Sequence, residues 1–135
     1  MKYDTVLLNM SELWLQIWEY VVYGSWPLWV RWLRETDDID ICVLRSVREK
    51  LIASERYNVV ITKYWNESFI LWNMEVAYTI PWLDFNEIEL AVMSPDIIDW
   101  VAYLSLGYTK QSKTWMNRPK DIADIRLIDE YLLHH

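Results

Sequence analysis

The chain has 135 residues, 53% of them hydrophobic and only two of them glycine, which fits one folded domain over residues 1–135 and excludes intrinsic disorder. Its net charge of -7 argues against binding along an extended DNA or RNA, because proteins that bind long nucleic acids are usually basic. A single cysteine excludes an internal disulfide, and the sequence has neither an apolar stretch of spanning length nor a signal peptide, so we expect a cytoplasmic protein.

The first half of the chain alternates helix and strand patterns. Asn9 or Ser11 suits the cap of a first helix, and Pro27 suits the first turn of a second. Ser46 followed by Glu49 forms a capping-box pattern at the start of a third helix. The predicted elements are a helix over residues 10–17, a strand over 19–23, a helix over 27–34, a strand over 38–44 and a helix over 46–56.

The second half adds strands and then helices. A polar hairpin around Asn66-Glu67 joins two predicted strands, Ser94-Pro95 opens a helix that Gly107 ends, and Pro119 opens the last helix. The predicted elements are strands over residues 58–64 and 68–78, a short edge strand over 88–93, and helices over 94–106 and 120–133. Strands interleaved with helices predict an α/β or α+β fold with a mixed central sheet flanked by helices.

Two short motifs carry the chemistry: Gly24-Ser25 after the first strand, and Asp38-Ile39-Asp40 on the second. Side chains alternate across a strand, so both aspartates point to one face and Ile39 to the other. Two neighbouring carboxylates repel each other unless a cation lies between them, and a hard divalent ion such as Mg²⁺ is the usual partner. The pattern therefore predicts metal-assisted chemistry on a phosphate. The alternative is that Asp38 and Asp40 are solvated acids on a surface strand.

These motifs resemble those of the nucleotidyltransferase superfamily, which includes DNA polymerase beta and the minimal nucleotidyltransferases. Its members carry Gly-Ser before a helix, Asp-x-Asp on the next strand and a third acid on a later strand. Glu75, in the segment NMEVAYTIPWLDFNEI, fills the third position, where relatives more often have Asp. The tail KTWMNRPKDIADIRLI is similar to the family's Lys-x₄-Arg-Pro-Lys-Asp ending. The resemblance runs, with gaps, from about Tyr20 to the C-terminus.

The resemblance implies an enzyme that moves a nucleoside monophosphate from an NTP to a small-molecule, protein or RNA hydroxyl. Asp38, Asp40 and Glu75 would be the catalytic residues and would hold Mg²⁺ or Mn²⁺. Rival third acids are Asp84 and Glu67. The residues expected to meet the nucleotide are Gly24, Ser25, Lys113 and Arg118. For Asp121 and Asp124 we prefer a structural role, as acids near a helix N-terminus.

A noncatalytic reading of the same fold stays open, as a nucleotide-binding or protein-interaction module. Trp26 directly follows the Gly-Ser pair, where relatives more often have small residues, and would narrow a nucleotide pocket. Ten tryptophans exceed what so small a core can hold, which makes an aromatic homodimer interface plausible. Most of them fit core positions, and Trp26 and Trp115 are the candidates for stacking on a base. Minimal family members also pair with helical proteins, in antitoxin-like couples.

Overall fold

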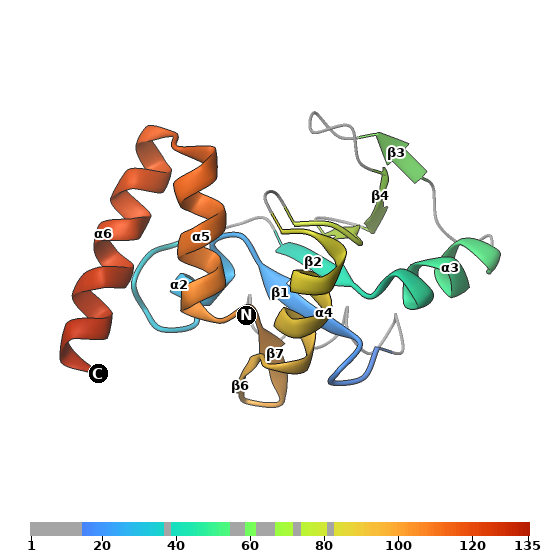
Figure 1. Ribbon diagram of the computed structural model, residues 1–135, viewed down its shortest axis with the longest axis horizontal. Helices are drawn as coiled ribbons and strands as arrows, with labels where there is room; N and C mark the ends of the chain where they lie inside the picture. Colours follow the sequence, from blue (N-terminus) through green and yellow to red (C-terminus); the bar gives the residue numbers. More distant parts are fainter. Residues whose placement is uncertain (1–14, 37–38, 55–58, 62–66, 72–73, 81–82) are drawn as a thin grey trace.

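The computed structural model describes residues 15–36, 39–54, 59–61, 67–71, 74–80 and 83–135. Within these residues seven strands form one mixed sheet in the order β3-β4-β5-β2-β1-β7-β6, with helices around it (Figure 1). The strands are β1 (Tyr20–Tyr23), β2 (Ile39–Val43), β3 (Val59–Ile61), β4 (Glu67–Leu71), β5 (Met74–Ala77), β6 (Asp96–Ile98) and β7 (Val101–Tyr103). The helices are α2 (Trp26–Trp29), α3 (Arg45–Ala53), α4 (Phe85–Met93), α5 (Leu106–Met116) and α6 (Pro119–His134). The predicted α+β fold class is confirmed.

The middle of the sheet mixes both strand directions. β2 runs antiparallel to β1 and parallel to β5, and β1 runs parallel to β7 on its other side. The two outer hairpins, β3–β4 and β6–β7, are antiparallel. β2 therefore lies between the strand that precedes the Gly-Ser pair and the strand that carries Glu75, so the fold itself brings the predicted site segments together.

One face of the central strands packs against α4. Val21 and Cys42 are fully buried there, in a cluster with Ile88, Ala91 and Val92 of that helix. Cys42 is thus a buried small hydrophobe, and burial raises the pKa of its thiol.

The opposite face holds the second large cluster. Ile39, Ile41 and Val43 are buried on it, which confirms the predicted alternation along β2. Trp26 joins this cluster with 1% of its surface exposed, and its ring centroid lies 4.5 Å from that of Trp29. Of the two candidate stacking tryptophans, Trp26 is therefore a core residue.

The helices other than α4 lie toward the two ends of the molecule (Figure 1). Figure 1 shows α5 and α6 side by side at one end, near α2, and α3 at the other end. Leu28 of α2 is buried with Leu106 and Ile128, and Trp26 of the same helix packs on the sheet residues, so α2 joins this helical end to the sheet layer. Among the described residues, no helix combines the length and the apolar character needed to cross a membrane.

The predicted edge strand over residues 88–93 is wrong, because this segment lies in α4. Asp84 caps the helix: its carboxylate accepts a hydrogen bond from the Glu87 backbone N–H at 2.8 Å, and Glu87 completes the capping box. Ile88, Ala91 and Val92 then follow helical spacing onto the sheet. The apolar run was short enough to fit either period, and the capping signal before it decides the outcome.

The predicted helix over residues 94–106 is also wrong. This segment forms the β6–β7 hairpin, in which Ile98 pairs with Val101 across a two-residue turn. Both turn residues, Asp99 and Trp100, have positive φ, as a type I′ hairpin turn requires. The helix begins only at Leu106, so Gly107 lies inside α5 instead of ending a helix.

Other predicted boundaries need smaller corrections. α2 is shorter than predicted, and α3 begins at Arg45 with Leu44 as its N-cap, so the predicted Ser46 capping box is wrong. The single strand predicted over 68–78 is two antiparallel strands, β4 and β5. The strand over 19–23, the β3–β4 hairpin and the last helix are confirmed, within the described residues. The first helix falls mostly outside those residues, and residues 15–17 are not helical.

Candidate functional site

The Gly-Ser turn lies directly against the carboxylate of Asp40. β1 ends at Tyr23, whose register partner is Asp40, and Gly24 follows with φ of +72°. A Cβ placed on Gly24 would lie 2.6 Å from Asp40 Oδ2, closer than nonbonded atoms tolerate. Glycine is therefore required at position 24 for two reasons: the backbone is left-handed, and a side chain there would collide with Asp40.

Asp40 and Glu75 are neighbours on adjacent parallel strands. The register of β2 and β5 pairs them directly, which puts both side chains on the same face, with their strands about 4.8 Å apart. Two residues further along each strand, on the same face, the paired residues Cys42 and Ala77 are buried. Asp40 and Glu75 are both partly exposed, so the face changes from apolar to acidic at the strand end. Two of the three predicted catalytic acids are thus brought together.

Ser68 is a site residue that the sequence did not reveal. Its hydroxyl donates a hydrogen bond of 2.9 Å to Glu75 Oε1, and it is 2% exposed. It reaches Glu75 because β4 folds back along β5. In one continuous strand over residues 68–78, as the sequence predicts, Ser68 and Glu75 would lie far apart. The one sequence signal for Ser68 is its polar side chain within an apolar run.

The donor set suits a hard divalent cation as far as the structure describes it. Two adjacent carboxylates supply the oxygen ligands that Mg²⁺ and Mn²⁺ prefer. Within the described residues, no three His, Cys, Asp or Glu side chains converge. Asp38, the third predicted ligand, lies outside those residues. Of the rival acids, Asp84 caps α4, and Glu67 pairs through its backbone with Ile61.

Ser25 occupies the N-cap position of α2. Its carbonyl oxygen accepts hydrogen bonds from the backbone N–H groups of Leu28 and Trp29. Its side chain makes no capping hydrogen bond to the described helix. Because α2 has only four residues, its dipole is small, and a ligand here would be bound chiefly by the turn and the Ser25 hydroxyl.

Lys113 and Arg118 lie in a network of buried ion pairs. Lys113 Nζ is 2.8 Å from Asp124 Oδ2 and 3.8 Å from Asp121 Oδ1, and Arg118 Nε is 2.6 Å from Asp121 Oδ2. Arg34, in the segment that leads toward β2, contacts both carboxylate oxygens of Asp124. The network therefore ties α5 and α6 to the segment that precedes the acidic strand.

Asp121 has a lowered pKa within this network. Burial raises its pKa, but hydrogen bonds from Arg118 and the positive charges of Arg118 and Lys113 together outweigh burial. Asp121 is also the N3 residue of α6, where its carboxylate accepts from the Arg118 backbone N–H at 3.0 Å. The preferred structural role of this acid agrees with these contacts.

No family model matches the chain, and no curated protein matches it.

Proposed function

We propose that the chain is a metal-dependent nucleotidyltransferase, which moves a nucleoside monophosphate from an NTP to a hydroxyl group of a small molecule, a protein or an RNA end. One observation carries the proposal: the Gly24 turn lies against Asp40, and Asp40 lies in register with Glu75. A backbone turn free of side chains, beside paired carboxylates, is suited to phosphate oxygens that share a cation with those carboxylates.

Each site residue has a defined task in the proposed reaction. Asp38, Asp40 and Glu75 would hold Mg²⁺ or Mn²⁺, which when bound lowers the energy of negative charge developing on the phosphate oxygens. Glu75 orients the acceptor hydroxyl and takes its proton as the new P–O bond forms. The bond from the same phosphorus to pyrophosphate breaks, and pyrophosphate leaves. Ser68 holds the Glu75 carboxylate in position through its 2.9 Å hydrogen bond.

The phosphate groups are assigned to the Gly24-Ser25 turn. Gly24 permits close approach of the backbone, and the Ser25 hydroxyl supplies a donor. The predicted phosphate contacts of Lys113 and Arg118 are assigned a smaller part, because both side chains are paired with Asp121. Cellular NTP and Mg²⁺, together with a reduced buried Cys42, fit the proposed cytoplasmic location.

Calorimetric titration with Mg²⁺ and ATP tests the proposal. The wild-type protein should bind MgATP saturably, and Asp40→Asn and Glu75→Gln should each weaken binding at least tenfold, because each removes one ionic ligand. Asp99→Asn is the matched control, since it makes the same acid-to-amide change in the β6–β7 turn. Absence of binding by the wild type at millimolar nucleotide, or equal binding by all variants, would refute the proposal.

A noncatalytic interaction module is the second candidate, and the exposed tryptophans favour it. Trp18, Trp32 and Trp100 are 49%, 91% and 86% exposed, and all three have positive φ, which bulky residues seldom adopt. Such residues suit contact with a second copy or with a helical partner protein. Sedimentation equilibrium tests this candidate. A dimer that dissociates in Trp32→Ser and persists in Asp40→Asn supports it. A wild-type monomer that also fails to bind a helical partner contradicts it.

A further inference from the structure

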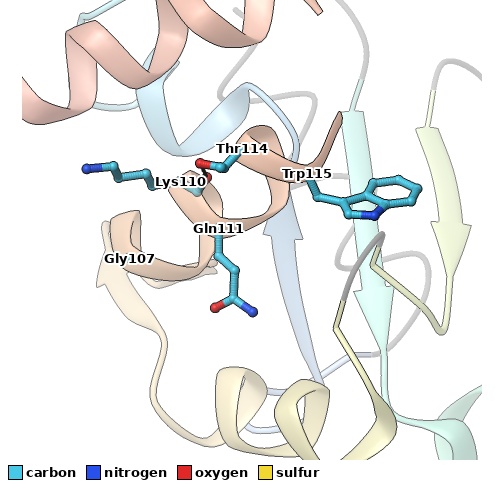
Figure 2. Close-up of a pocket in the computed structure, with 5 residues that line it drawn as sticks. All are labelled: Gly107, Lys110, Gln111, Thr114 and Trp115. Carbon is cyan, nitrogen blue, oxygen red and sulfur yellow. Dashed lines mark hydrogen bonds between the residues drawn. The ribbon is translucent and has the colours of Figure 1, made fainter. Parts of the chain in front are cut away.

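A second feature of the molecule, outside the acidic strand end, is a pocket on α5. Its volume is about 410 Å³, within the range of small-ligand sites. Its lining follows helical spacing along one side of the helix (Figure 2) and consists of Gly107, Lys110, Gln111, Thr114 and Trp115. We propose that this pocket binds the nucleobase of the NTP, an inference that rests on the proposed function and extends it to base recognition.

Trp115 supplies the stacking surface. Its side chain is 43% exposed, unlike the buried indole of Trp26, so part of it is accessible to a ligand. In the view of Figure 2 the indole extends from α5 across the ribbon of β2, the strand that carries Asp40, and away from Lys110. Stacking on an indole tolerates every base, because each base has a π-face. The pocket also adjoins α4, since Gln111 is hydrogen-bonded to Glu87, and α4 packs on Cys42, which shares its face of β2 with Asp40. We therefore place the base on this side of a nucleotide whose phosphates lie at the Gly24 turn.

The polar lining is held in place by neighbouring elements. Gln111 Nε2 donates a 3.0 Å hydrogen bond to Glu87 Oε2 of α4, which fixes the plane of the amide. An amide offers both an acceptor and donors, the groups that read a base edge. Thr114 Oγ1 donates to the Lys110 carbonyl at 2.7 Å, and Lys110 Nζ is 2.5 Å from Asp129 Oδ1. Among the described lining residues none is acidic, and Lys110 is the charged one.

Gly107 has no side chain, so it leaves space in the pocket beside the first turn of α5. A Cβ at Gly107 would meet only Ser105 Oγ, at 4.0 Å, so a larger side chain fits there without a backbone clash. Any such side chain would extend into the pocket that Gly107 lines. This position therefore provides a way to block the pocket while α5 stays intact.

Binding of MgATP and of Mg-tripolyphosphate, compared by calorimetry, tests the proposal. Trp115→Ala should weaken ATP about tenfold or more, the size of a base–aromatic stack, and leave tripolyphosphate unchanged. Gly107→Leu should do the same by filling the pocket, and Trp115→Phe should retain most of the affinity. Leu133→Ala is the control, because Leu133 is a large hydrophobic residue that is 81% exposed and does not line the pocket.

The outcomes separate this proposal from the one it rests on. If the wild type binds both ligands and Trp115→Ala and Gly107→Leu bind ATP as tightly as it does, the base site is refuted and the phosphate site stands. If the wild type binds neither ligand, the nucleotidyltransferase proposal fails, and the base site fails with it.

Discussion

Gly24 and Gly107 are the two glycines of the chain, and their surroundings differ sharply. Gly24 has a left-handed backbone and the Asp40 carboxylate beside it, whereas Gly107 lies in a helix with open space around it. Gly24→Ala should destabilise the fold by about 1–2 kcal/mol from the backbone alone, and it should also weaken Mg²⁺ binding by displacing Asp40.

Urea denaturation of both alanine variants measures the effect. Gly107→Ala should stabilise the protein by up to about 0.5 kcal/mol, because alanine is the better helix former and Gly107 lies in the first turn of α5 and not in its interior. Equal unfolding free energies for the two variants would contradict the assigned roles of the two positions.

Asp121 and Asp129 provide a second matched pair, both on α6. Asp121 is fully buried in its ion pairs, whereas the side chain of Asp129 is 51% exposed. Because the folded state lowers the pKa of Asp121, its contribution to stability is complete above the unfolded value of about 3.9. That contribution is lost as the pH falls through the lower folded value.

Asp121→Asn should therefore cost about 2 kcal/mol near pH 7, and its difference from wild type should shrink in acid. Asp129→Asn should change stability by less than about 1 kcal/mol, because exposed ion pairs contribute little. Unfolding curves measured from pH 7 down to about pH 2 test both expectations. A pH-independent penalty for Asp121→Asn would show that its charge is not what stabilises the network.

At the scale of the elements, the β6–β7 hairpin carries a residue that its turn does not favour. Trp100 has φ of 69° at the second turn position, where glycine is preferred in a type I′ turn. Trp100→Gly should raise the unfolding free energy by about 1 kcal/mol, since it removes the cost of a left-handed side chain. Thermal unfolding measures this. A loss of stability would mean that the indole contributes more to the fold than its 86% exposure indicates.

The same hairpin shows why some elements escaped prediction. Asp99-Trp100 lacks the glycine that marks such turns, so the sequence pattern favours a helix opened by Pro95. The α4 segment fits both periods, and its identity depended on the capping pair Asp84 and Glu87. Segments with one strong signal, such as the buried strand before Gly24 and the helix after Pro119, were predicted well.

At the scale of the whole molecule, the site was predictable where it depends on strand alternation and motif order. Strand alternation predicted the face that Asp40 occupies, and the resemblance to the nucleotidyltransferase motifs placed Gly24 and Glu75 beside it; the structure brings these three together. Ser68 and the α5 pocket were not predictable, because they depend on which strands and helices become neighbours in space. The buried partners of Lys113 likewise required the packing of α5 on α6.

Electron paramagnetic resonance of Mn²⁺ tests the central claim most directly, because it counts bound ions without requiring turnover. In the presence of ATP, we expect the wild type to bind Mn²⁺ saturably and both Asp40→Asn and Glu75→Gln to lose most of that binding, while Asp99→Asn binds as the wild type does. Equal Mn²⁺ binding in all four proteins, or none in the wild type, would contradict a cation site at the paired carboxylates.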